Sequence, residues 1–216
     1  MTIRVSRWAA PLAAGLGLLA ASTFGAAAED IKIAHVYGKT GALEAYAKQS
    51  HTGLMMGLEY ATDGTMEIDG RKIVVIEKDT QLKPDIAKGA LAEAYGDDEV
   101  DIAVGPVSSG VALAMLPVAE EYEKILIVEP AVADSITGAN WNRYIFRTSR
   151  NSSQDAIANA VALGQEGVSI ATLAQDYAFG RDGVAAFKEA LEGTGANLVF
   201  EEYAPTDTKD FTANAQ

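Results

Sequence analysis

The residues with the clearest chemical potential are two adjacent serines, Ser108 and Ser109, in the segment Gly105–Gly110. An apolar run that predicts a strand precedes this segment, and a run that predicts a helix follows it, so the hydroxyls would stand at a helix N-terminus. A helix N-terminus presents unpaired backbone N–H groups and a positive dipole end, which suits a carboxylate ligand. Serines are also common helix caps, and the spacing alone leaves both interpretations open.

Two further loops are predicted at the same edge of a sheet. Gly38–Tyr46 follows the first predicted strand and places Tyr46 at the start of a helix, where its ring suits either a core position or a pocket wall. Glu129–Asp134 follows a later strand and contains Pro130. Open α/β sheets bind small ligands at the carboxyl ends of their strands, so these loops and the serine segment form the candidate binding site.

Motifs for covalent or metal chemistry are not found in the sequence. Gly38-Lys39-Thr40 follows a strand, but Ile33 stands where a phosphate-binding loop needs a glycine. There is no G-x-S-x-G nucleophile elbow, and the absence of cysteine excludes disulfides and thiolate sites. The only two histidines, His35 and His51, fall in a predicted strand and a predicted helix, which favours structural roles. We therefore expect no enzyme activity, no metal and no cofactor.

The elements that would position the loops alternate between strand and helix. Short apolar strands between amphipathic helices predict an α/β fold with doubly wound parallel sheets covered on both faces. The predicted strands are Ile31–Tyr37, Lys72–Asp79, Val100–Val104, Ile125–Glu129, Tyr144–Arg147, Val168–Ala174 and Asn197–Tyr203. The predicted helices cover Glu44–Ala61, a segment opening at Pro84, a segment from Ser108 or Ser109 past Pro117, Ser153–Gln165, Arg181–Glu192, and a last one from Asp207 or Thr208.

The pattern changes near residue 148. Four strand–helix units come before this point, which is about one complete lobe. A helix, a strand, a helix and a strand follow, and the sequence then stops inside the last predicted helix. We therefore expect an N-terminal ligand-binding lobe over residues 29–148 and a partial, truncated second lobe over residues 149–216.

The N-terminal residues 1–28 have the order of a cleaved signal peptide. Arg4 and Arg7 are followed by an apolar run, Trp8–Phe24, and by the small residues Ala26–Ala28. Cleavage would change the net charge from −13 to −15, because two arginines are lost. We expect a mature periplasmic protein without stable membrane insertion, because no later stretch reaches spanning length. An acidic chain with 17 basic residues against 30 acidic ones is also not expected to bind nucleic acid.

Several motifs occur together in one order along the chain. They are the Gly105–Gly110 segment, the Pro130 loop, Tyr144-Ile145-Phe146-Arg147-Thr148 with Asn151-Ser152-Ser153-Gln154, Asp176-Tyr177-Ala178-Phe179-Gly180, and Lys209-Asp210-Phe211. On these motifs the chain, from Ile31 to Gln216, resembles the type I periplasmic binding proteins, in the leucine/isoleucine/valine-binding branch that serves ABC transporters. The resemblance implies two doubly wound lobes, joined by three crossovers, that close over a ligand by hinge rotation. It also implies that nearly half of a family-length chain lies beyond Gln216.

The resemblance also implies a carboxylate site in the first lobe. Ser109, or else Ser108, would bond the ligand carboxylate, and backbone groups at Ala131 and Ala133 would complete the site. The amino-acid-binding members usually carry a threonine where Ala133 stands, so one hydroxyl donor is lost here. Ala133 therefore favours a second ligand class, namely aromatic or other organic acids or small amides.

Aromatic residues would wall the cleft on both sides. By the resemblance, Tyr46 would line it from the first lobe, and Tyr177 or Phe179 would close it from the second. Glu129 stands where the family usually has a small or apolar residue, and it would either face the ligand or pair with a neighbouring cation. The acidic group that usually receives a ligand ammonium would lie beyond Gln216.

Taken together, the residues and the resemblance predict the periplasmic solute-binding component of an ABC transporter. It would capture a small carboxylate-bearing solute, such as a branched-chain or other amino acid, and deliver it to permease subunits. A ligand-sensing module for a membrane receptor would use the same cleft, and the sequence does not separate it from transport. An exported α/β hydrolase is disfavoured, because neither a nucleophile elbow nor a plausible base is present.

Overall fold

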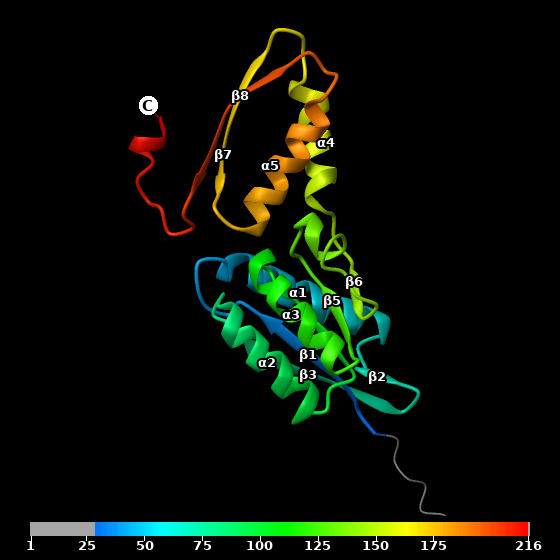
Figure 1. Cartoon of the computed structure of the whole chain (residues 1–216). Coiled ribbons are helices and arrows are strands. Elements are labelled where there is room, and N and C mark those ends of the chain that lie inside the picture. The colour runs from blue at the N-terminus through cyan, green and yellow to red at the C-terminus, as the bar shows by residue number, and fades with distance from the viewer. Residues whose placement is uncertain (1–28, 216) are drawn as a thin grey trace, which may run out of the picture.

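The computed structural model describes residues 29–215, so the predicted signal peptide lies outside the described residues. The described residues form two lobes placed end to end, and the chain passes from one to the other between β6 and α4 (Figure 1). We call residues 31–147 the first lobe and residues 152–204 the second lobe. The sheet of the first lobe ends at Arg147, and α4 begins at Ser152.

The first lobe is built on a six-stranded sheet with the order β2-β3-β1-β4-β5-β6. Neighbouring strands are parallel except at the edge, where β2 pairs antiparallel with β3. The parallel core confirms the predicted α/β class, whereas β2 escapes prediction because it has only two residues, both exposed. The strands are β1 (Ile31–Tyr37), β2 (Glu67–Ile68), β3 (Arg71–Asp79), β4 (Ile102–Val104), β5 (Ile125–Val128) and β6 (Ile145–Arg147).

Both faces of this sheet are covered by helices. Because successive side chains of a strand point to opposite faces, β1 divides its apolar residues between two cores. Ala34 and Val36 join the larger core with residues of α2 and α3, and Ile33 joins a smaller core under α1. The helices are α1 (Glu44–Ala61), α2 (Pro84–Gly96) and α3 (Ser109–Glu121), and a short 3-10 helix, η1 (Asp134–Ile136), follows β5.

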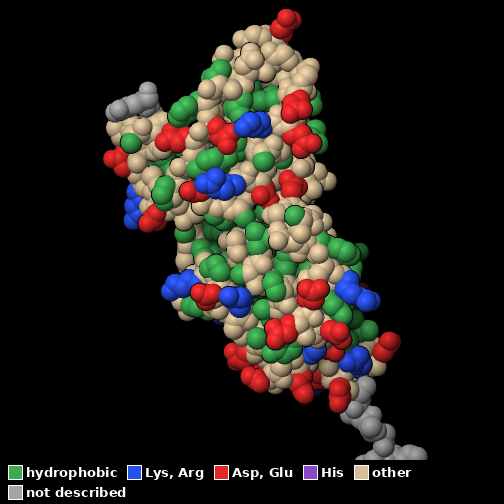
Figure 2. All heavy atoms as spheres, in the orientation of Figure 1, with side chains coloured by type: hydrophobic (Ala, Val, Ile, Leu, Met, Phe, Trp, Pro, Cys, Tyr) green, Lys and Arg blue, Asp and Glu red, His purple; other side chains and the backbone are tan. Residues whose placement is uncertain are grey.

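The second lobe contains two parallel strands and two helices. The strands β7 (Ser169–Gln175) and β8 (Asn197–Ala204) pair with each other, and α4 (Ser152–Leu163) packs on α5 (Ala178–Leu191). The predicted helix–strand–helix–strand order is confirmed. Val199 and Phe200 on β8 remain largely exposed. Acidic side chains are spread over both lobes and gather at the end of the first lobe that faces away from the second (Figure 2).

Two predicted helices differ from the structure. Helix α5 begins at Ala178, three residues before the predicted start, since Gly180 allows a tight turn against the carbonyl of Gln175. The predicted last helix from Asp207 or Thr208 is wrong: the chain stays irregular until the 3-10 helix η2 (Thr212–Ala215). The Asp210 carboxylate accepts bonds from the Thr212 backbone N–H (2.9 Å) and hydroxyl (2.6 Å), so it sets this later start.

Candidate functional site

The serine segment crosses the carboxyl end of the first-lobe sheet at very close range. Gly105 has a φ of +125°, and a Cβ there would lie 2.1 Å from the carbonyl oxygen of Val36 on β1. Only glycine fits this approach. The following residues then lead directly into α3, so the serines stand at the helix start, as predicted.

The two serines have different roles in the structure. Ser109 is buried, and its hydroxyl accepts a bond from the backbone N–H of Ala133 (3.2 Å). Ser108 occupies the N-cap position without a side-chain capping bond, and it lines a cavity between the lobes. The Ala131 N–H donates to the Pro106 carbonyl (3.2 Å), so both predicted backbone donors already have partners inside the protein. In this arrangement Ser108 is the serine that faces the cavity.

The cavity between the lobes has a volume of about 630 Å³, which is a suitable size for a small solute. Tyr177 packs across it, with its Cδ2 atom 3.5 Å from the position of a Cβ on Gly110. Burial raises the pKa of the Tyr177 hydroxyl, so it remains a neutral donor. The lining residues from the first lobe are Ala42, Leu43, Leu82, Pro84, Ser108, Gly110 and Val111, and those on the side of the second lobe are Gln175, Tyr177 and Thr206–Lys209.

Tyr46 and Glu129 line a separate cavity of about 590 Å³ between α1 and the carboxyl ends of β4 and β5. The Tyr46 side chain is 62% exposed at its rim. Glu129 accepts a bond from the Thr148 hydroxyl (2.7 Å), so it bonds a hydroxyl here rather than the cation that was one of its two predicted partners. The Ser50 hydroxyl is buried against this cavity without a hydrogen-bond partner among the described residues.

Phe179 lies apart from both of these cavities. It lines a space of about 780 Å³ inside the second lobe, between α4, α5 and β7. Its ring centroid is 6.0 Å from that of Tyr177. Of the two aromatic residues expected to close the cleft, Tyr177 therefore lines the cavity between the lobes, whereas Phe179 lines the space inside the second lobe.

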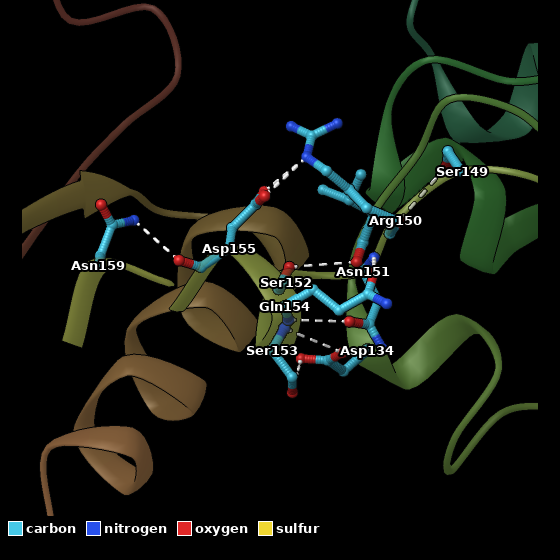
Figure 3. A network of polar contacts seen from close by, with 10 residues as sticks. Asp134, Ser149, Arg150, Asn151, Ser152, Ser153, Gln154, Asp155 and Asn159 are labelled. Atoms are coloured by element: carbon cyan, nitrogen blue, oxygen red, sulfur yellow. Dashed lines mark hydrogen bonds and ion pairs between the residues drawn. The ribbon is translucent and has the colours of Figure 1, made fainter. Parts of the chain in front are cut away.

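The segment between the lobes is held by a polar network (Figure 3). Asn151 and Gln154 form a reciprocal capping box at the start of α4, with both bonds at 3.0 Å. The Asp134 carboxylate, from the loop after β5, accepts bonds from the backbone N–H (3.3 Å) and hydroxyl (2.8 Å) of Ser153. The loop at the candidate site is thus bonded directly to the first helix of the second lobe.

A cluster that the sequence did not reveal lies beneath α1. His35 on β1 is fully buried, and its Nδ1 atom lies 3.0 Å from Nδ1 of His51 on α1. Tyr37 stacks on His35 with ring centroids 4.0 Å apart and donates a hydrogen bond to Glu77. Burial, reinforced by His51, lowers the pKa of His35 to about 4. The His35 ring is therefore neutral near pH 7, which is consistent with the structural role predicted for it.

The described residues contain neither a candidate metal site nor a candidate membrane-spanning helix. Within residues 29–215, no group of three or more His, Cys, Asp or Glu side chains could hold a metal ion. No helix in the described part of the chain is both long and apolar enough to span a bilayer. What the geometry offers is a cavity between two lobes, lined by hydroxyls, an aromatic ring and two charged residues, Asp207 and Lys209. These groups suit non-covalent binding of a small polar solute.

Known proteins share this architecture. The model of the periplasmic binding protein family matches residues 30–216. A Leu/Ile/Val-binding protein of Rhizobium johnstonii is 26% identical over 185 residues, which cover 85% of this chain and 50% of that protein. The chain therefore spans about half the length of this relative.

Two solved structures are also similar, and the chain again covers half of each. The crystal structure of an ABC-type branched-chain amino acid transporter from Rhodopseudomonas palustris is 76% identical, with a TM-score of 0.70, over 87% of this chain and 50% of that one. A solute-binding protein of an ABC transporter from Rhodopseudomonas palustris, in complex with 3,4-dihydroxybenzoic acid, is 30% identical, with a TM-score of 0.78, over 86% and 50%. With a family match over nearly all described residues, the chain belongs to the periplasmic binding protein family, in the branch that includes the Leu/Ile/Val-binding proteins.

Proposed function

We propose that this protein is the periplasmic solute-binding component of an ABC transporter, exported through the signal peptide at residues 1–28. It captures a small carboxylate-bearing solute between an N-terminal domain at residues 29–148, which contains the first lobe, and a partial second domain at residues 149–216, which contains the second lobe. The observation that carries the proposal is the cavity of about 630 Å³ to which both lobes contribute, with Ser108 on one side and Tyr177 on the other. Capture requires no covalent step, and delivery is to permease subunits.

The ligand class that we favour first is an amino acid with an aliphatic side chain. A zwitterion needs a donor for its carboxylate and an acceptor for its ammonium group. The Ser108 hydroxyl and the Lys209 ammonium supply donors at the cavity, and the Asp207 carboxylate supplies an acceptor. The 76% identical structure is that of a branched-chain amino acid transporter, and this likeness supports the same class.

Aromatic acids are the second candidate, and two observations favour them. By the resemblance, Ala133 stands where amino-acid-binding members usually carry a threonine, so one hydroxyl donor is lost. The similar solute-binding protein from Rhodopseudomonas palustris holds 3,4-dihydroxybenzoic acid, which is an aromatic carboxylate. An aromatic acid has no ammonium group, so it would use Lys209 and Ser108 without needing Asp207.

Thermal unfolding of the natural gene product, read to its stop codon, tests the proposal. The panel contains aliphatic, polar and aromatic amino acids, benzoate-type acids and small amides. A ligand at about a hundred times its dissociation constant adds about 2.7 kcal/mol to the free energy of unfolding, which raises the Tm by several degrees. No shift with any member of the panel would contradict the proposal.

Two variants then separate the ligand classes. Lys209→Met should weaken every carboxylate ligand, because it removes a positive charge at the cavity. Asp207→Asn should weaken an amino acid but not a benzoate-type acid, because only the amino acid carries an ammonium group. Equal loss of both ligands in Asp207→Asn would refute the assignment of Asp207 to the ammonium.

A further inference from the structure

The loop after β5, residues 129–135, is bonded to the rest of the molecule at nearly every position. The Val132 carbonyl accepts bonds from the backbone N–H (2.9 Å) and hydroxyl (3.1 Å) of Ser152. The Ala133 carbonyl accepts a bond from the Arg147 guanidinium (2.9 Å). This loop is therefore bonded both to the end of β6 and to the start of α4, so it anchors the passage between the lobes.

One contact of this loop reaches beyond the connecting segment to helix α5. The backbone N–H of Ser135 donates to the Asp182 carboxylate at 2.9 Å. Asp182 does not belong to the connecting segment: it stands near the start of α5, in the body of the second lobe. Helix α5 also packs against α3 and η1 of the first lobe at this place. The Ser135–Asp182 bond thus joins the two lobes directly.

The same loop is coupled to the serine segment. The Ala133 N–H donates to the buried Ser109 hydroxyl, two residues before the bond that reaches the second lobe. A rotation of the second lobe would therefore act, through the Ser135–Asp182 bond, on a segment that is also bonded to the buried Ser109 hydroxyl. Burial lowers the pKa of Arg147, and the negative charges of Asp134 and Asp182 oppose that change.

The two lobes are in contact across the cavity. Tyr177 of the second lobe lies against Gly110 of the first, and both line the cavity. The Ser135–Asp182 bond lowers the free energy of this arrangement relative to one with separated lobes. The apparent affinity of a ligand for a protein that must close depends on the fraction of molecules that are already closed.

We propose that Asp182 is a positioning residue for solute capture: its bond to the Ser135 amide holds the two lobes in the joined arrangement. Asp182 touches no ligand and acts only on the balance between joined and separated lobes. The effect on affinity rests on the proposed function, whereas the effect on lobe separation does not. Loss of the bond, which involves a charged acceptor, should weaken ligand binding by about tenfold.

The test measures lobe separation and affinity in the same variants of the natural gene product, read to its stop codon. Residues 1–216 contain no cysteine, so spin labels can be attached at introduced cysteines. Glu121→Cys at the end of α3 and Asn197→Cys at the start of β8 are exposed and lie in different lobes. Electron–electron double resonance then gives the distance distribution between the lobes without ligand.

Asp182→Ala should shift this distribution toward longer distances and weaken binding of the solute found in the thermal panel. Asp182→Asn keeps an oxygen acceptor without the charge, so its values should lie between those of the wild type and Asp182→Ala. Glu189→Ala removes one exposed acidic side chain from the same helix and should change neither measurement. Circular dichroism checks that each variant is folded.

Two results would overturn the proposal. An unchanged distance distribution in folded Asp182→Ala would show that the bond does not hold the lobes, whatever the affinity. Longer distances without weaker binding would show that the joined arrangement is not the one that captures solute. If no solute in the panel binds, the proposed function fails, and the distance measurement still decides whether Asp182 holds the lobes.

Discussion

The buried His35 should make the folded protein less stable in mild acid. The ordinary pKa of histidine is 6.5, and the pKa of His35 in the folded protein is about 4. Between these values the unfolded chain binds a proton that the folded protein does not, so stability falls as the pH decreases. The His35 contribution is present above pH 6.5 and is lost progressively as the pH falls toward 4.

The size of the effect follows from the two pKa values. A pKa difference of one unit corresponds to about 1.36 kcal/mol, so lowering the pH from about 7.5 to about 5 should cost about 2 kcal/mol of unfolding free energy through His35. Glu77 and Asp79, whose pKa values are also lowered in the folded state, act mainly near and below their ordinary values of 4.5 and 3.8. The change in stability between about pH 7.5 and about pH 5 therefore reports chiefly on His35.

Urea unfolding at several pH values measures this loss. Trp141 is the only tryptophan in residues 29–216 and reports on the first lobe by fluorescence. The variant His35→Gln serves as the comparison, because the difference in pH dependence between it and the wild type removes the contribution of groups that titrate in both proteins. Equal pH dependence of the two proteins, or a His35 ring that titrates near its ordinary pKa of 6.5 by NMR, would refute the reasoning.

Two further predictions concern backbone geometry. Gly105→Ala should lower the unfolding free energy by about 3 to 5 kcal/mol, because its Cβ would meet the Val36 carbonyl at a positive φ, whereas Gly57→Ala, in open space on α1, should be neutral or slightly stabilising by urea unfolding. Asn151→Ala should cost about 1 kcal/mol through loss of the α4 cap; a cost no larger than that of Asn159→Ala on the same helix would contradict the capping role.

Most of the fold could be predicted from local sequence pattern. Continuous β-branched runs such as Ile73–Ile76 indicate buried strands, and the spacing of small and apolar residues identifies α1 over the same bounds as the structure, Glu44–Ala61. The predictions are wrong where a single residue decides the local geometry. Asp210 delays the last helical turn, and Gly180 advances the start of α5, and neither effect leaves a periodic signal.

The candidate site could be located from sequence but not resolved. Ser108 and Ser109 are adjacent and chemically alike, and only the third dimension shows that one bonds the Ala133 amide while the other faces the cavity. The contact between the two histidines could not be predicted from the sequence either, because His35 and His51 lie 16 residues apart on a strand and a helix. Their contact depends on how α1 packs across β1, which no short motif encodes.

The two first-lobe backbone amides that were expected to bind a carboxylate already have partners, and this affects which groups could hold a solute. The Ala131 and Ala133 amides already donate within the first lobe, Ala133 to the Ser109 hydroxyl, whereas Ser108 lines the cavity. Lys209, the charged donor that lines the same cavity, comes from the chain after β8, on the side of the second lobe. Under the proposed function, a carboxylate would therefore be bonded by groups from both lobes at once. Such a ligand binds the joined arrangement far better than the separated one, and this difference in affinity is what a capture mechanism by closure requires.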